Sequence, residues 1–222
     1  RRHIHSQMQE IKKTLEETEL HRQRAREKRH ASEVFQIGLI GYTNAGKSTI
    51  INRLTDAATL EEDKLFATLD PLTRKLTLPN QFQATITDTV GFIRKLPPEL
   101  VAAFRATLEE VSEADLLLLV IDSADKDPVG NMEIVLETLK ELKADGLPRI
   151  IVLNKIDKTG SEAEFIAMEL RARGEDTVKV CALTGEGFEE LLERVKRHAS
   201  EYFERRMALP LEEIMTQATD GM

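Results

Sequence analysis

The chain has 222 residues, of which 41% are hydrophobic and 32% charged, and its formal net charge is −8. This length can bury one substantial core with some chain left over, so we expect one globular domain with extensions. The single cysteine, Cys181, excludes a disulfide framework. No apolar run approaches the roughly 20 residues that a membrane span needs, and the charged first residues carry no signal-peptide pattern. We therefore expect a soluble protein of the cytoplasm.

The first thirty residues differ in charge from the rest of the chain. They hold nine Lys and Arg against five Asp and Glu, whereas the remaining residues have a net charge of −12. Residues 1 to 31 contain no Gly or Pro, and an apolar stripe recurs there at helical spacing, which predicts one long helix that packs against a partner helix. The stripe consists of Ile4, Met8, Ile11 and Leu15.

The second half of this predicted helix, residues 21 to 30, is basic where the apolar stripe has ended. Two interpretations stay open, a solvated face or a contact with RNA, whose phosphates attract a basic segment. Because the rest of the chain is acidic, a contact with nucleic acid is expected here first. The stripe without a partner also predicts that the chain is a fragment, which lacks the other arm of a helical hairpin.

A glycine-rich motif follows the first predicted strand, residues 34 to 40. It reads Gly41-x-x-x-x-Gly46-Lys47-Ser48 and leads into a predicted helix over residues 47 to 54, which is the context that a phosphate-binding P-loop requires. The glycines let consecutive N–H groups point inward at the positive end of the helix dipole. Lys47 is expected to meet the β and γ phosphates, and the Ser48 hydroxyl to bind Mg²⁺. The residues expected to hold the nucleotide here are Gly41, Asn44, Ala45, Gly46, Lys47, Ser48 and Thr49.

Residues 55 to 74 follow neither helical nor strand periodicity. A long loop beside a nucleotide site is expected to order around the γ-phosphate and Mg²⁺ as the first switch. Residues 74 to 78 and 83 to 88 alternate in polarity around a Pro-Asn pair, which predicts an antiparallel hairpin. The hairpin ends in a D-x-x-G motif, in which Asp88 is expected to hold Mg²⁺ through water and the Gly91 N–H to contact the γ-phosphate.

From residue 99 onward, predicted helices and strands alternate. The helices cover residues 99–111, 132–142, 161–171 and 187–203, and the strands cover residues 116–121, 149–153 and 177–181. This pattern predicts an α/β domain with a mostly parallel sheet, whose ligands sit at the carboxyl ends of the strands. We expect a basic helix at residues 1–32, a nucleotide-binding domain at residues 33–204 and a tail at residues 205–222, in which residues 209–215 are amphipathic.

An N-K-x-D motif, Asn154 to Asp157, lies at the end of one of these strands. The Asp157 carboxylate can accept two N–H bonds from guanine that adenine cannot supply, and the Asn154 amide can donate toward O6 or N7. Lys155 can lay its stem along the base plane. Alone, the motif could be a helix-capping turn, but a P-loop in the same chain favours a guanine site.

Cys181-Ala182-Leu183 ends the last predicted strand at the same edge of the sheet. The Ala182 N–H could bind guanine O6 there, although the pattern is weak by itself. Cys181 is expected to be a small buried residue and not a reactive thiol.

Five segments together resemble the translation-factor-related GTPases, and within them the HflX-type proteins. They are Gly41 to Ser48, Phe66-Ala67-Thr68-Leu69-Asp70-Pro71, Asp88-Thr89-Val90-Gly91-Phe92, Asn154 to Asp157 and Ala182-Leu183-Thr184-Gly185-Glu186-Gly187. The resemblance spans roughly residues 1 to 202. It implies a three-layer P-loop GTPase sandwich with a six-stranded, mostly parallel sheet that has one antiparallel strand. It also implies GTP hydrolysis with Mg²⁺, and association with the large ribosomal subunit in the splitting or rescue of ribosomes.

The resemblance assigns roles that spacing alone does not. Thr68 would be the switch threonine that binds Mg²⁺ in the GTP state beside Ser48 and Asp88, with Thr73 as the alternative. Lys47 and Thr68 are expected to stabilise the transition state. The residues implied at the nucleotide in this switch are Phe66, Ala67, Thr68, Leu69 and Asp70.

Three positions differ from the pattern of Ras-like enzymes or from that of the HflX-type family, or bear on the mechanism. Phe92 stands where Ras-like enzymes carry the glutamine that orients the attacking water, so the catalytic group is unknown and we expect slow intrinsic hydrolysis that the ribosome accelerates. Asn44 lies where related GTPases can hold K⁺ beside the phosphates; the alternative is an amide that stabilises the loop. The family usually has Ser at Cys181, and little effect is expected because the contact there comes from the backbone.

Two other functions remain open on the sequence. One is a scaffold that binds GTP, hydrolyses it negligibly and meets a protein partner through the apolar stripe. The other is an RNA-binding assembly factor of the Era or Obg kind, with the basic helix as its contact. No contact with DNA is expected.

Overall fold

The computed structural model describes residues 34–55, 72–78, 82–88, 111, 113–141 and 144–208, and the following description is confined to them. The chain divides into two compact units, residues 1–34 and 35–222, and the second is described here. The predicted basic helix, most of the predicted switch loop and the amphipathic residues 209–215 lie outside the described residues. The predicted helix at 99–111 also lies outside them, except for its last residue.

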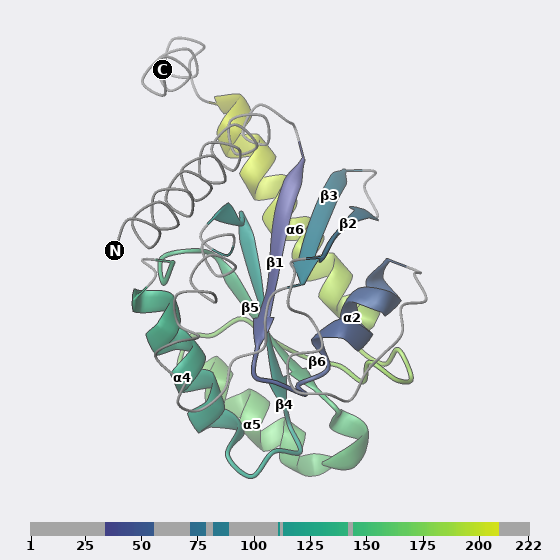
Figure 1. Ribbon diagram of the computed structural model, residues 1–222, viewed down its shortest axis with the longest axis vertical. Coiled ribbons are helices and arrows are strands. Elements are labelled where there is room, and N and C mark those ends of the chain that lie inside the picture. Colours follow the sequence, from purple (N-terminus) through teal and green to yellow (C-terminus); the bar gives the residue numbers. More distant parts are fainter. Residues whose placement is uncertain are drawn as a thin grey trace, which may run out of the picture. The chain divides into compact units, whose positions relative to one another are not determined.

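Six strands form one sheet in the order β2-β3-β1-β4-β5-β6. Strand β2 pairs with β3 in antiparallel fashion, and every other pairing is parallel. This confirms the expected six-stranded sheet with one antiparallel strand (Figure 1). The strands are β1 (Phe35–Gly41), β2 (Leu72–Thr77), β3 (Gln83–Asp88), β4 (Leu116–Asp122), β5 (Arg149–Asn154) and β6 (Thr177–Lys179).

The two faces of the sheet are covered by different helices (Figure 1). Along β4, Leu116 and Leu118 pack with residues of α2 and α6, whereas Leu117 and Leu119 pack with residues of α4 and α5. A strand that is apolar at every position before its final Asp122 therefore serves both cores, because successive side chains point to opposite faces. The result is the predicted three-layer sandwich. The helices are α2 (Lys47–Leu54), α4 (Pro128–Glu141), α5 (Ser161–Ala172) and α6 (Phe188–Ala208).

Strand β2 begins at Leu72 and not at residue 74, so residues 72 and 73, which we assigned to the switch loop alone, belong to the sheet. The reason is pairing with β3: Thr73 lies opposite Thr87, and the two hydroxyl oxygens are 3.0 Å apart. Cross-strand threonine pairs of this kind stabilise a sheet, and their effect on a strand boundary cannot be read from periodicity within one segment.

Two helices extend beyond their predicted bounds. Helix α4 begins at Pro128 and not at residue 132, because Asp127 accepts the Gly130 N–H at 3.0 Å and proline fits the first helical position. Helix α6 continues to Ala208, past the predicted end at residue 203. Its later turns have their own contacts: Phe203 packs on Phe82 with ring centroids 4.7 Å apart.

The parallel pairing brings the carboxyl ends of five strands to one edge of the sheet. Asp88 lies opposite Leu39 near the end of β1, and Asp122 lies opposite Asn154. Ala45, in the loop after β1, and Asn154, at the end of β5, thus meet at this edge although 109 positions separate them in the chain. Among the described residues, no helix has the length and hydrophobicity of a membrane span.

Candidate nucleotide-binding site

The loop between β1 and α2 curls around the ammonium group of Lys47. The Lys47 Nζ donates to the carbonyl oxygens of Gly41 and Tyr42 at 3.3 and 3.2 Å. Asn44 and Gly46 have φ values of 62° and 95°, in the left-handed region that asparagine and glycine tolerate. The loop therefore has the tightly curved backbone that the sequence motif predicts.

Burial lowers the pKa of the Lys47 ammonium to about 8, although the nearby Asp88 carboxylate raises it in part. The side chain is only 8% exposed. Burial of a cation with too little negative charge around it disfavours its charged form. A bound anion would stabilise the charged form by direct attraction. Lys47 thus favours binding of a phosphate group at this loop.

Ser48 and Asp88 place two oxygen ligands side by side at the start of α2. The Ser48 hydroxyl donates to Asp88 Oδ2 at 3.2 Å, and the Asp88 side chain is buried. Hydroxyl and carboxylate oxygens are the donors that Mg²⁺ prefers, usually together with water and phosphate oxygens. These two residues fit the predicted magnesium site.

Asn154 joins three loops at the edge of the sheet. Its Nδ2 donates to the Ala45 carbonyl at 2.8 Å, its Oδ1 accepts the Ala182 N–H at 3.0 Å, and its carbonyl oxygen accepts the Ser123 N–H at 2.9 Å. We expected its amide and the Ala182 N–H to face guanine, whereas in this structure each has a partner within the protein. Their contact with the base therefore stays a prediction, and the structure adds a bracing role that the motif did not reveal.

Lys155 connects the same strand end to the P-loop. Its Nζ donates to the Asn44 carbonyl and to Asp122 Oδ2, both at 2.7 Å. Its own φ of 64° lies in the left-handed region, which is uncommon for lysine. Asp122 was not among the candidate site residues. Its position as an acidic residue at the end of a buried strand is the signal that could have identified it.

Asp157 and Cys181 are in contact close to Lys155 and its bonds to the P-loop. The Cys181 Sγ donates to Asp157 Oδ1 at 3.2 Å, and Cys181 is buried, as predicted. Asp157 is exposed, so its carboxylate is accessible to a ligand. Leu183, on the following loop, is 67% exposed. The predicted base-reading residues therefore lie together at one edge.

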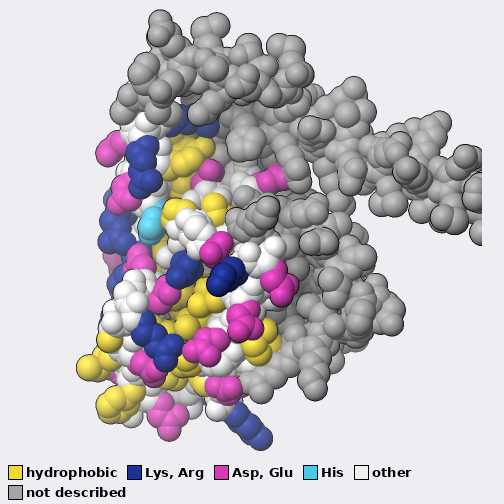
Figure 2. Space-filling view, turned by 90° about the vertical axis from the view of Figure 1, so that its left-hand side faces the viewer, with side chains coloured by type: hydrophobic (Ala, Val, Ile, Leu, Met, Phe, Trp, Pro, Cys, Tyr) yellow, Lys and Arg dark blue, Asp and Glu magenta, His cyan; other side chains and the backbone are white. Residues whose placement is uncertain are grey.

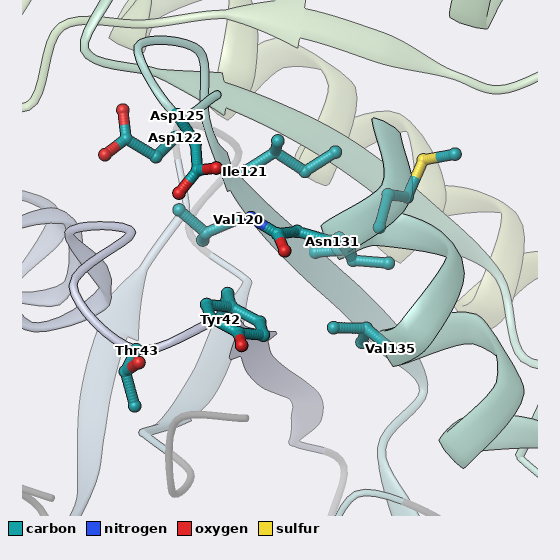
Figure 3. Close-up of a pocket in the computed structure, with 10 residues that line it drawn as sticks. Tyr42, Thr43, Val120, Ile121, Asp122, Asp125, Asn131 and Val135 are labelled. Carbon is teal, nitrogen blue, oxygen red and sulfur yellow. The ribbon is translucent and has the colours of Figure 1, made fainter. Parts of the chain in front are cut away.

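A small hollow that opens to solvent adjoins the P-loop on the side of α4. In Figure 3 the side chains of Tyr42 and Asn131 face each other across it, with Asp122 and Asp125 on its rim. Asn131 is a buried polar residue, only 7% exposed. Sequence reasoning missed it because we placed the start of α4 after this residue.

The remaining predicted site residues lie outside the described residues. They are Phe66, Ala67, Thr68, Leu69, Asp70, Gly91 and Phe92. Thr49, which is described, follows Ser48 on the first turn of α2. The roles of Thr68 in binding Mg²⁺ and of Gly91 at the γ-phosphate stay predictions.

A P-loop, an acidic strand end and an N-K-x-D motif at one edge of a parallel sheet define a P-loop nucleotide-binding domain of the GTPase class. Residues 36–155 match the family model described as 50S ribosome-binding GTPase. A GTPase HflX from Lacrimispora saccharolytica is 46% identical over 92% of this chain and 48% of its own length. The chain belongs to the family of 50S ribosome-binding GTPases, and its sequence is of the HflX type.

Solved structures agree with this assignment. A GTP-binding protein from Sulfolobus solfataricus in complex with GDP is 30% identical, with a TM-score of 0.63 over 76% of this chain and 53% of that one. Era in complex with MgGDPNP and part of 16S ribosomal RNA is 26% identical, with a TM-score of 0.63 over 75% of this chain and 57% of that one. The chain spans less than half the length of four HflX relatives that it matches.

Proposed function

We propose that this chain is a guanine-nucleotide switch that hydrolyses GTP and acts on the large ribosomal subunit. The observation that carries the proposal is the contact of Asn154 with both Ala45 and Ala182, since it unites the phosphate loop and the predicted base-reading loops in one site. The family assignment supports the same reading.

Each part of the site has a chemical task in this proposal. The backbone N–H groups of the P-loop and Lys47 bind the phosphates, and Asp157 reads the N1 and N2 donors of guanine. Ser48 and Asp88 would hold Mg²⁺, which neutralises phosphate charge when bound. Hydrolysis adds water to the γ-phosphorus and breaks its bond to the bridging oxygen, so that GDP and phosphate leave. Lys47 stabilises the negative charge on the transferred group.

The residue that orients the attacking water is not among those that the sequence or the described structure identifies. Phe92 has no polar atom, so we infer that another group or a bound partner positions the water. Slow hydrolysis by the chain alone and faster hydrolysis on the ribosome follow from this inference.

Contact with the ribosome is assigned to residues 1–30, whose net charge is positive. On the face shown in Figure 2, Lys and Arg side chains alternate with Asp and Glu and form no broad basic area among the described residues of that face, which supports this choice. Phosphate-rich RNA favours a surface of one positive sign. The process that we propose is the splitting or rescue of ribosomes in the cytoplasm.

The decisive experiment is multiple-turnover GTP hydrolysis with and without purified large subunits. We expect slow turnover alone, acceleration by large subunits, no use of ATP, and loss of all activity in Lys47→Ala. Rapid turnover that large subunits leave unchanged would contradict the proposal.

Two further assays separate this proposal from the other functions. Salt-dependent co-sedimentation with large subunits distinguishes it from a scaffold that meets only a protein partner. GTP-dependent splitting of intact ribosomes distinguishes it from an assembly factor, which would bind the subunit without separating the ribosome.

A further inference from the structure

Arg53, near the end of α2, connects the P-loop helix to the loop that follows β6. Its Nε donates to the Ala182 carbonyl at 2.7 Å, and its Nη2 donates to the Leu183 carbonyl at 2.5 Å. Its guanidinium carbon lies 5.7 Å from the centre of the Phe188 ring, close enough for a cation–π contact. A planar guanidinium with several donors suits such a combined contact, and lysine could not reproduce it.

The loop that Arg53 contacts is compact. The Gly185 N–H donates to the Cys181 carbonyl at 2.8 Å, and the Cys181 N–H donates to the Glu186 carbonyl at 2.9 Å. Gly185 has a φ of 91°, and a Cβ there would lie 2.8 Å from Nη1 of Arg53. The glycine therefore permits a close approach between this loop and the guanidinium.

The contact determines the direction of backbone N–H groups in the loop. In a trans peptide, the carbonyl of one residue and the N–H of the next point in opposite directions. Because the carbonyls of Ala182 and Leu183 bond to Arg53, the N–H groups of Leu183 and Thr184 point away from it. The N–H that we expect near guanine O6 is that of Ala182, the residue whose carbonyl Arg53 holds, and in this structure it donates to Asn154 Oδ1.

We propose that Arg53 is a positioning residue for base recognition, which holds the loop at residues 182 and 183 against α2. The inference rests on the proposed function, since it takes guanine to be the bound base. Arg53 acts through the backbone and is not assigned a contact with the nucleotide. Helix α2 also begins with Lys47 and Ser48, so one short helix would position both the phosphate and the base ends of the site.

The test compares binding of GDP and 6-thio-GDP to the 222-residue chain, because sulfur accepts hydrogen bonds more weakly than O6. Arg53→Met should weaken GDP binding by about tenfold, as the loss of bonds from a charged donor predicts. It should weaken 6-thio-GDP much less, so the preference for GDP falls. Arg53→Lys should lie between Met and wild type, and Arg205→Met, which alters an exposed arginine on α6, should match wild type.

Preference for GDP over IDP provides the second readout. IDP lacks the amino group that Asp157 reads, so this preference should survive in Arg53→Met. Equal weakening of GDP and 6-thio-GDP by Arg53→Met would show a general structural role and overturn the inference. A wild-type chain that binds GDP without preferring it to 6-thio-GDP would overturn it too.

Failure of the proposed function gives a different result, namely no binding of guanine nucleotide by the wild-type chain. Circular dichroism and thermal unfolding without nucleotide establish that each variant is folded. Should Arg53→Met fail to fold, Arg53→Lys supports the same comparison of the two nucleotides.

Discussion

Asn154, at the end of β5, donates its side-chain amide to the Ala45 carbonyl in the P-loop at 2.8 Å, across 109 positions of sequence. The same side chain accepts the Ala182 N–H from the loop after β6. A residue whose motif is associated with the base thus also supports the phosphate loop.

Asn154→Ala should destabilise the nucleotide-free chain by about 2 to 4 kcal/mol, because it leaves two buried backbone groups without their partner. Denaturant unfolding without nucleotide measures the effect. Thr184→Ala is the matched control in an exposed part of the same region and should change stability by less than about 0.5 kcal/mol. Unchanged stability of the Asn154 variant would show that the bonds of Asn154 to Ala45 and Ala182 do not stabilise the nucleotide-free protein.

Gly46→Ala should disrupt the P-loop. Gly46 has a φ of 95°, and an added Cβ would overlap the Nδ2 of Asn154. We expect a loss of about 2 kcal/mol in stability from left-handed strain and displacement of Asn154, together with a large loss of GDP affinity. At Gly146 an added Cβ meets nothing within 4 Å, so Gly146→Ala serves as the control. Equal affinity in the two variants would contradict this account of the loop.

GDP affinity should depend on pH through Lys47. In the free chain burial lowers the Lys47 pKa to about 8, whereas bound phosphate would raise it, so binding above pH 8 must be coupled to proton uptake. Affinity should be level below this pH and fall by up to about tenfold per unit above it. Calorimetry in two buffers of different ionisation enthalpy measures the proton uptake. Lys47→Arg, which does not titrate in this range, should lack this uptake; persistence there would assign the proton to another group.

The lowered pKa of Lys47 also makes the stability of the folded, nucleotide-free chain depend on pH. The charged form of Lys47 is disfavoured in the folded free chain, so its cost is fully present below pH 8 and disappears as pH rises toward 10.5. At pH 7 the cost corresponds to about 3 kcal/mol. Lys47→Met should therefore raise the unfolding free energy of the nucleotide-free chain at neutral pH while it reduces nucleotide binding. A destabilised Met variant would contradict this sign.

Asp157→Asn should shift preference from guanine to xanthine nucleotides, because an amide can donate to the xanthine oxygen where a carboxylate accepts from guanine. A change in the GDP to XDP affinity ratio of about a hundredfold or more is expected for a site that reads such a group. Cys181→Ser keeps a donor for Asp157 and should leave the ratio near that of wild type. Retained GDP preference in Asp157→Asn would remove Asp157 from base recognition.

GTP hydrolysis should be faster in K⁺ than in Na⁺ if Asn44 holds the cation. Asn44 is exposed on the P-loop with a φ of 62°, so Asn44→Gly removes the side chain without backbone strain. The variant should lose the difference between the two salts and still bind GDP. Equal rates of the wild-type chain in K⁺ and Na⁺ would leave Asn44 as a loop-stabilising amide.

Local features of the chain predicted much of this domain. The β1–P-loop–α2 unit was predictable because the spacing of its glycines and Lys47 is typical of one backbone geometry. Strand β4 was predictable because an unbroken apolar run such as Leu116 to Ile121 suits a strand that is buried on both faces. The start of α4 was also encoded, in Asp127 and Pro128, although periodicity alone placed it later.

Only the tertiary structure determined which polar atoms form hydrogen bonds with one another across the site. The bonds from Asn154 to Ala45, from Lys155 to Asn44 and from Arg53 to Ala182 each span more than 100 residues. Local sequence cannot specify such pairs, because they depend on the order β3-β1-β4-β5-β6, which brings the strand ends to one edge. Residue types determine which chemistry is available at this edge, and strand order determines which atoms are close enough to carry it out.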